Sequence, residues 1–180
     1  GRIFIQGGDG KYIGKDLGTG EKIGEDAAAI FFDADGDTDI DLLLLSGSSE
    51  YGHSSSLNVP RLYLNNGKGD FSFSEKAIPP DISSLSQVAE ASDFDQDGDM
   101  DLFIGGRVIP DQYPTPARSY LLRNDKGKFV DVTEALCNDL VKPGLVTAAQ
   151  WADLNKDGRE DLIICGDWMP VRFFMNRNEK

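Results

Sequence analysis

Hydrophobic residues along the chain fall into short runs that are separated by clusters of Gly, Asn and Asp. The runs are about four to six residues long and rich in Ile, Val, Phe, Tyr and Leu, which is typical of β-strands. Gly, Asn and Asp favour turns because they tolerate a positive φ. No stretch sustains the i, i+3, i+4 spacing of an amphipathic helix, and the best helical candidate is a turn at 133–140. The pattern therefore predicts an all-β protein.

The strand pattern repeats along the chain. Three nonapeptides rich in aspartate start at residues 33, 93 and 153, a spacing of 60 residues twice over. A small or apolar segment precedes each nonapeptide, and an apolar run follows it: 27–32 and 42–45, 88–92 and 102–104, 146–152 and 162–164. A second shared unit, an apolar strand that leads into a Gly-rich turn, occurs at 2–12, 61–71 and 119–129, with a truncated copy at 172–178.

Each period thus predicts a strand, an acidic loop, a strand, a variable loop, a strand, a Gly-rich turn and a strand. A repeat of roughly 40 to 60 residues with four strands is typical of a β-propeller blade. We therefore expect blades of four antiparallel strands, about three blade equivalents in all. Their expected bounds are 1–26 for a hairpin of a preceding blade, 27–86 and 87–145 for two blades, and 146–180 for an incomplete blade.

Propellers close with about four to eight blades. We therefore expect the chain to be an arc of a larger propeller, and the remaining blades to be its partners. A free-standing open arc is the alternative, and it would leave edge strands exposed.

The acidic nonapeptides have the composition of metal-binding loops. Carboxylates at alternate positions converge when the backbone curls around one point, and they repel one another unless a cation lies between them. Oxygen ligands in this number suit Ca²⁺, whereas soft metals need the Cys or His that these loops lack. We predict up to three Ca²⁺ ions, one in each loop. Side chains at positions 1, 3, 5 and 9 and the backbone carbonyl at position 7 are the expected ligands.

The predicted ligands are Asp33, Asp35, Asp37, Asp39 and Asp41 in the first loop, Asp93, Asp95, Asp97, Asp99 and Asp101 in the second, and Asp153, Asn155, Asp157, Arg159 and Asp161 in the third. A glycine at position 6, as in Gly98, permits a sharp turn. The first loop departs from this pattern, with Gly36 at position 4 and Thr38 at position 6. We expect its turn to be strained or differently shaped.

Two other interpretations of these loops compete with calcium binding. An EF-hand loop also starts D-x-D-x-D-G, but it needs a Glu at position 12. That position holds Leu44, Ile104 and Ile164, which lie in apolar runs. The loops could also be solvated acidic turns, but three copies at a fixed period favour metal binding.

The segments 29–42 and 91–102 resemble the FG-GAP/VCBS repeat family, and the units 62–69 and 120–125 fit it too. The chain is most similar to bacterial proteins of the VCBS/ASPIC-UnbV type and to the related cartilage acidic protein, although it lacks the Phe-Gly and Gly-Ala-Pro signatures of integrin repeats. The resemblance implies an integrin-α-like propeller with calcium in the acidic loops. It also implies a protein that is secreted, periplasmic or on a cell surface.

Charge and hydrophobicity exclude several functions. The net charge of −13 argues against general affinity for nucleic acid or anionic membranes, because phosphate contacts need a basic face. The longest wholly apolar run, 27–32, is far shorter than the roughly 20 residues that span a bilayer. The chain starts without Met or a leader-like segment, so we expect a mature or trimmed piece. Cys137 and Cys165 are expected to be buried free thiols, with one disulfide as the alternative.

The dense carboxylates are assigned as metal ligands, so we expect a binding or scaffold module and not an enzyme. The alternative is a part of a calcium-dependent, lyase-like enzyme that acts on polysaccharides. A protein or glycan ligand would bind at the face opposite the acidic loops, where the variable loops 46–60, 105–118 and 165–170 are expected. These loops carry Tyr51, His53, Arg107, Tyr113 and Trp168. Packing on its own blade is the other interpretation of Trp168.

Overall fold

The computed structural model describes residues 1–17, 25–47, 56–83 and 85–177. Short antiparallel strands make up nearly all of its regular structure, so the all-β prediction is confirmed. In chain order the elements are β1 (Arg2–Gln6), β2 (Tyr12–Asp16), β3 (Asp26–Phe32), β4 (Asp41–Ser46), η1 (Ser56–Asn58), β5 (Arg61–Asn65), β6 (Phe71–Phe73), β7 (Ser86–Ser92), β8 (Asp101–Gly106), β9 (Tyr120–Asn124), β10 (Phe129–Asp131), α1 (Thr133–Leu136), η2 (Asn138–Leu140), β11 (Leu145–Ala152), β12 (Asp161–Asp167) and β13 (Met169–Phe174). The helical turn expected near 133–140 is present as α1 and η2.

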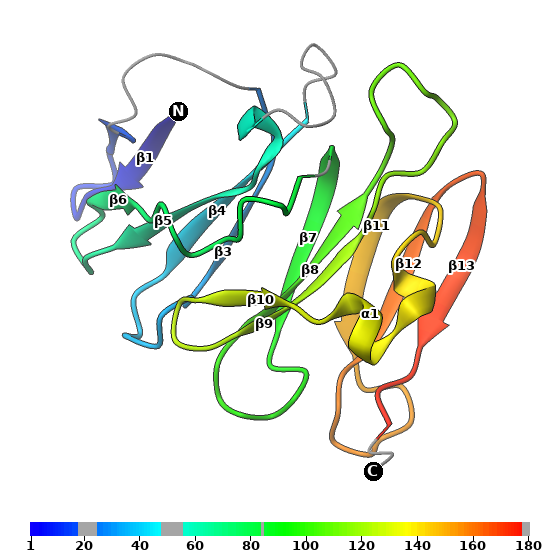
Figure 1. Ribbon diagram of the computed structural model, residues 1–180. Helices are drawn as coiled ribbons and strands as arrows, with labels where there is room; N and C mark the ends of the chain where they lie inside the picture. Colours follow the sequence, from blue (N-terminus) through cyan, green and yellow to red (C-terminus); the bar gives the residue numbers. More distant parts are fainter. Residues whose placement is uncertain (18–24, 48–55, 84, 178–180) are drawn as a thin grey trace.

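Within the described residues the strands form four antiparallel sheets, which are β1–β2, β3–β6, β7–β10 and β11–β13. We call the last three the first, second and third blades. They stand side by side, and β7 of the second blade contacts both β3 and β11 (Figure 1). In each blade the pairing of the first two strands shifts register at the same place, between Asp26 and Ala28, between Ser86 and Val88, and between Val146 and Ala148. The fold is therefore a row of repeated sheets, as propeller blades are.

Side chains of the middle strands fill a core on each side of the second blade, because successive residues of a strand point to opposite faces. All six residues of β8 are buried. Leu102 and Ile104 belong to the core between the first and second blades, and Phe103 belongs to the core between the second and third. Burying each such side chain contributes roughly 1.5–3 kcal/mol. A continuous apolar run in β8 is thus explained by a neighbouring blade on each side.

The outer faces of the terminal blades are only partly covered. The β1–β2 hairpin contributes Ile3 to a small core on the first blade, beside the buried Leu42 and Tyr63. Phe31 on β3 is 57% exposed, and Phe173 on β13 is 59% exposed. Apolar surface of this kind fits further blades of a larger propeller, in agreement with the repeats.

The expectation of a variable loop at 165–170 is wrong. β12 extends to Asp167 and β13 begins at Met169, so that Trp168 alone connects them. The physical reason is that Gly166 pairs on both sides, with Val146 of β11 and with Met169 of β13. Trp168 makes the reversal with a φ of 59°.

One buried side chain joins the first two blades at the end of β9. Asn124 is 1% exposed. Its Nδ2 donates to the carbonyl oxygen of Ala34 in the first blade at 2.8 Å and to that of Met100 in its own blade at 3.0 Å, and its Oδ1 accepts from the Gly127 amide at 2.8 Å. Asn176 repeats the first of these bonds, since its Nδ2 donates to the carbonyl of Phe94 in the second blade at 2.7 Å.

We predict that Asn124→Ala lowers the free energy of unfolding by about 3 kcal/mol, because it leaves buried carbonyls and an amide without partners. Asn65→Ala is the matched control. Asn65 occupies the same place in the first blade, but its Nδ2 donates to Ile40 of its own blade. The control should lose about 1 kcal/mol. Equal losses in urea unfolding would contradict a stabilising bond between blades.

Candidate metal centres

The three acidic loops connect the first two strands of each blade. They lie along one edge of the row of sheets, the lower edge in Figure 1, and the β8–β9 and β12–β13 connections lie along the opposite edge. Their backbones share one conformation, with a positive φ at positions 4 and 6. These residues are Gly36 and Thr38, Gln96 and Gly98, and Lys156 and Gly158.

The first loop therefore has the same backbone shape as the other two, although its sequence allowed a different one. Thr38 adopts a φ of 74°, where the second loop has Gly98. This conformation costs a β-branched residue roughly 1–3 kcal/mol, so the expected strain is located at Thr38. The second and third loops place Gln96 and Lys156 in the left-handed region instead. The sequence pattern did not predict a positive φ at position 4, although the first loop has a glycine, Gly36, there.

Each loop winds around its own carboxylates. In every copy the position 1 aspartate accepts from the backbone amide at position 6. Asp33 accepts from Thr38 at 2.9 Å, Asp93 from Gly98 at 3.0 Å and Asp153 from Gly158 at 2.9 Å. The position 5 aspartates, Asp37, Asp97 and Asp157, each accept from the amide at position 7 at 2.9 Å. These bonds hold the side chains on the inside of the turn.

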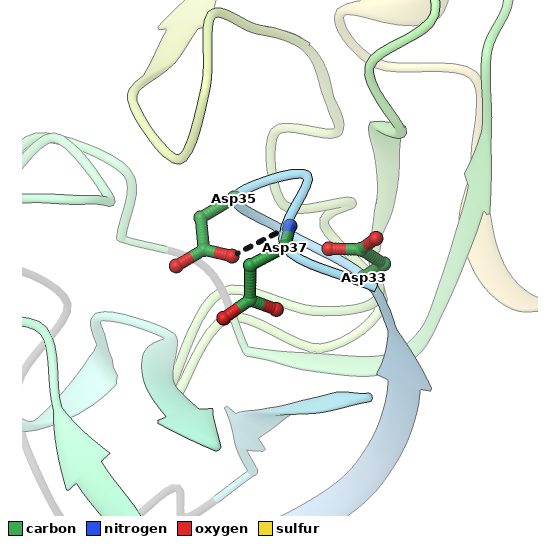
Figure 2. A group of neighbouring side chains, drawn as sticks. All are labelled: Asp33, Asp35 and Asp37. Atoms are coloured by element: carbon green, nitrogen blue, oxygen red, sulfur yellow. Dashed lines mark hydrogen bonds between the residues drawn. The ribbon is translucent and has the colours of Figure 1, made fainter. Parts of the chain in front are cut away.

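Two of the loops bring three carboxylates together. Oxygens of Asp33, Asp35 and Asp37 lie within 4.8 Å of one another, and so do oxygens of Asp93, Asp95 and Asp101. Figure 2 shows the first group, with the Asp35 carboxylate accepting from the Asp37 amide at 3.3 Å. Oxygen-only groups of this kind could hold a metal ion.

The third loop differs in its chemistry. Asn155 accepts from the Asp157 amide through Oδ1 at 2.9 Å, as the position 3 aspartates do in the other loops. Its Nδ2 then donates to Asp157 Oδ2 at 2.9 Å, where those loops have a second carboxylate oxygen. Among the residues that the structure describes, no third group of three acidic side chains forms here.

In the first two loops the side chain at position 7 lies at the side of the loop. The Asp99 carboxylate accepts from the Lys126 amide at 3.1 Å, and Asp39 lies against Gly67, so both side chains face the third-to-fourth strand turn of their own blade. Ligation by the carbonyls of Asp39, Asp99 and Arg159 stays a prediction.

Position 9 has a role that the sequence did not reveal. Asp41, Asp101 and Asp161 are all 0% exposed. One oxygen of each accepts from the amide at position 2, at 2.8, 3.2 and 3.0 Å. The other oxygen accepts at 2.8 Å from the backbone amide of an asparagine at or just after the end of the third strand. This asparagine is Asn65, Asn124 or Asn176, respectively. This carboxylate therefore fixes the acidic loop to the third strand. The asparagine that recurs at this place in each blade is the sequence signal from which the role of position 9 could have been inferred.

Burial and mutual repulsion favour the protonated form of several of these acids. Burial raises the pKa of Asp101 from 3.8 to about 7, and it also raises the pKa of Asp41. Burial, and next the charge of the position 5 aspartate, raise the pKa of Asp35 and of Asp95. A cation among these oxygens would favour the ionised form instead.

Some of the residues expected to bind a ligand at the opposite edge lie within the described part of the chain. Tyr51 and His53 lie outside the described residues. Trp168 is 83% exposed, and its Nε1 donates to the hydroxyl of Tyr113 at 2.8 Å. Arg107 forms an ion pair with Asp167 at 3.2 Å, next to Trp168 in the chain. The structure thus joins Tyr113 to Trp168 and leaves both exposed, which excludes the interpretation of Trp168 as a packed residue. Cys137 and Cys165 are free thiols, half-buried rather than buried.

Comparison with known proteins agrees with the repeated sheets and loops. The sequence model of the FG-GAP-like repeat matches residues 33–104 and again residues 93–164. The chain belongs to the FG-GAP-like repeat family, so the predicted resemblance and the propeller-blade fold are confirmed, and the VCBS and integrin-like affinities stay predictions. A search of curated proteins gives no match. No helix in the described part of the chain is long and apolar enough to span a bilayer.

We predict that the metal-free protein loses stability as the pH rises from about 4 to 7. In this range folded Asp101 binds a proton that the unfolded chain does not, so the free energy of unfolding falls with pH. Melting in chelator from pH 4.5 to 8 should give a falling melting temperature, and Asp101→Asn should flatten the curve. A melting temperature that rises over this range would contradict the protonated carboxyl.

Proposed function

We propose that the chain is a segment of an extracellular, calcium-binding propeller module that binds a protein or glycan ligand and is not itself an enzyme. The observation that carries the proposal is the repeated loop, because in two of its three copies carboxylate oxygens of three side chains lie within 4.8 Å of one another. Extracellular modules that bind Ca²⁺ through oxygen ligands have affinities suited to the calcium concentration outside cells.

The donor set favours Ca²⁺. The two groups of gathered side chains offer carboxylate oxygens alone. Ca²⁺ accepts six to eight oxygens in a flexible arrangement, whereas Mg²⁺ requires a strict octahedron. The side chains at positions 1, 3, 5 and 9 and the carbonyl at position 7 would hold one ion in each loop.

The role proposed for calcium is structural. The loops recur at the same place in each blade, and a catalytic site would need a local asymmetry with an open coordination position. The carboxylates already accept backbone amides that shape the turn. A bound ion would neutralise their repulsion and fasten the turn between the first two strands.

A ligand would bind at the edge opposite the calcium loops. There Trp168 and Tyr113 present two exposed rings joined by a hydrogen bond, beside the Arg107–Asp167 ion pair. Exposed aromatic rings with neighbouring polar groups suit both a sugar ring and an aromatic-rich protein surface. This surface is the proposed ligand site.

Calcium should raise the melting temperature, with about 2.7 kcal/mol gained per site at a free concentration a hundredfold above Kd. We predict that Asp97→Ala removes more of this gain than Asn155→Ala, because the second loop offers four carboxylates and the third replaces one with an amide. Glu75→Ala, an exposed acid outside the loops, is the control. A melting temperature indifferent to chelator would overturn the calcium assignment, and equal losses for the two variants would contradict graded ligation.

The ligand surface is tested with xylan, laminarin, dextran and pectate in calcium. We predict that binding of one of them quenches tryptophan fluorescence and that Trp168→Ala weakens that binding about two- to tenfold, since a stacked aromatic ring is worth roughly 0.5–1.5 kcal/mol. Phe173→Ala, an exposed ring on β13, should leave it unchanged. Quenching that survives Trp168→Ala would refute the assigned surface, and calcium-dependent cleavage of pectate would support the enzymatic alternative.

A further inference from the structure

Two side chains of the second blade hold the third acidic loop by hydrogen bonds. Gln96 stands at position 4 of the second loop, and its Nε2 donates at 2.7 Å to the carbonyl oxygen of Gly158, at position 6 of the third loop. Ser92 directly precedes the second loop and is 1% exposed. Its hydroxyl donates at 2.6 Å to Oε2 of Glu160, at position 8 of the third loop. The two loops are thus joined by side chains that are not among the predicted metal ligands.

Both bonds end next to Arg159, whose backbone carbonyl at position 7 is a predicted ligand of the third loop. The peptide group between Gly158 and Arg159 is planar, so a bond that fixes its carbonyl also fixes its N–H. That N–H donates at 2.9 Å to Asp157, the position 5 ligand. Glu160 follows Arg159 and is held by Ser92. The second blade therefore positions the third loop on both sides of its predicted carbonyl ligand.

An aromatic pair joins the beginnings of the same two loops. Phe94, at position 2 of the second loop, is 6% exposed. Its ring stacks on that of Trp151, with centroids 6.1 Å apart and planes inclined by 19°. Trp151 stands two residues before Asp153, the first predicted ligand of the third loop. Ordering of either loop should therefore change the surroundings of Trp151, so its fluorescence can report on both.

The first and second loops lack the side chains for equivalent bonds. Position 4 of the first loop is Gly36, which has no side chain to donate. The residues at the places of Ser92 and Glu160 are Phe32 and Met100, which are apolar and pack in the same core. The bond from an asparagine side chain to the preceding loop is common to both pairs of loops, so it does not distinguish them. The second and third loops are therefore the more closely joined pair.

We propose that calcium binding in the second and third loops is positively coupled through Gln96 and Ser92, and that the first loop is coupled to the second more weakly. The inference rests on the proposed calcium function. Without metal the carboxylates of a loop repel one another, so ordering the loop costs free energy. An ion in the second loop fixes Gln96 and Ser92, which then hold the third loop in its binding conformation. The next ion meets a loop that is already ordered, so its Kd falls, and by linkage the effect is reciprocal.

Charge acts in the opposite direction. A divalent ion in one loop weakens the negative potential that attracts an ion to the next loop. This effect is screened over about 8 Å at physiological ionic strength, and it acts on both pairs of neighbouring loops. A comparison of the two pairs therefore separates coupling by hydrogen bonds from the effect of charge.

The test is calorimetric titration of calcium, at physiological ionic strength, into full-length chains in which an alanine at position 5 disables chosen loops. Asp37→Ala leaves the second and third loops as a pair, and Asp157→Ala leaves the first and second. Chains with two of the substitutions Asp37→Ala, Asp97→Ala and Asp157→Ala keep a single loop and give its Kd alone. We predict that the second and third loops bind about fivefold more tightly as a pair than their single-loop Kd values imply. The first and second loops should agree with their single-loop values within about twofold.

Gln96→Met removes the donor and keeps the length and charge of the side chain. It should abolish the coupling of the second and third loops, and it should leave the Kd of the third loop unchanged when Asp97→Ala disables the second. A merely structural role for Gln96 would instead weaken the third loop in both chains. Gln112→Met, at an exposed glutamine of the opposite edge, is the matched control and should retain the coupling.

Fluorescence gives a second measurement of the same coupling. Trp168→Phe leaves Trp151 as the single tryptophan, and its emission in the chain that keeps the second and third loops should follow one cooperative transition with calcium. Independent binding by these loops, or a coupling equal to that of the first and second, would overturn the inference while calcium binding itself stands. Absence of calcium binding in every chain would overturn the proposed function and the inference together.

Discussion

The arrangement of the blades depends on one buried carboxylate at the end of each acidic loop. Asp41, Asp101 and Asp161 are removed from solvent, and each accepts one amide from its own loop and one from the third strand of its blade. An uncompensated carboxylate in such a place would be costly, so these amides must be held in position. The loop, the strand that leaves it and the third strand consequently form one unit.

The asparagine that supplies the second amide extends this unit to its neighbour. Asn124 and Asn176 send their side-chain amides to a backbone carbonyl in the loop of the preceding blade. Apolar packing brings the blades together, because residues of β8 point alternately into two cores. That packing has little direction of its own, whereas the hydrogen bonds fix one blade against the next. Repeated polar contacts therefore set the alignment that the cores stabilise.

Much of this fold could be predicted from the sequence, since the aspartate spacing and the short apolar runs locate the strands of each blade. The acidic loops could be found for the same reason. What the sequence could not give were contacts between residues far apart in the chain, such as the amide of Asn176 on Asp161. The shape of the first loop was also missed, because Gly36 and Thr38 exchange the places of a permissive and a restricted residue without changing the backbone path. The turn at Trp168 was missed because pairing on both sides of Gly166 extends the strands.

The single-residue reversal at Trp168 has a consequence for how the repeat can change its length. The interval from Asp161 to Asn176 is far shorter than the interval from Asp41 to Asn65, yet both pairs make the same hydrogen bond at 2.8 Å. The difference is taken up at the edge away from the acidic loops. Insertions and deletions at that edge leave the pairing at the acidic loops in register. The edge away from the acidic loops can therefore differ from blade to blade while the spacing of the blades is kept.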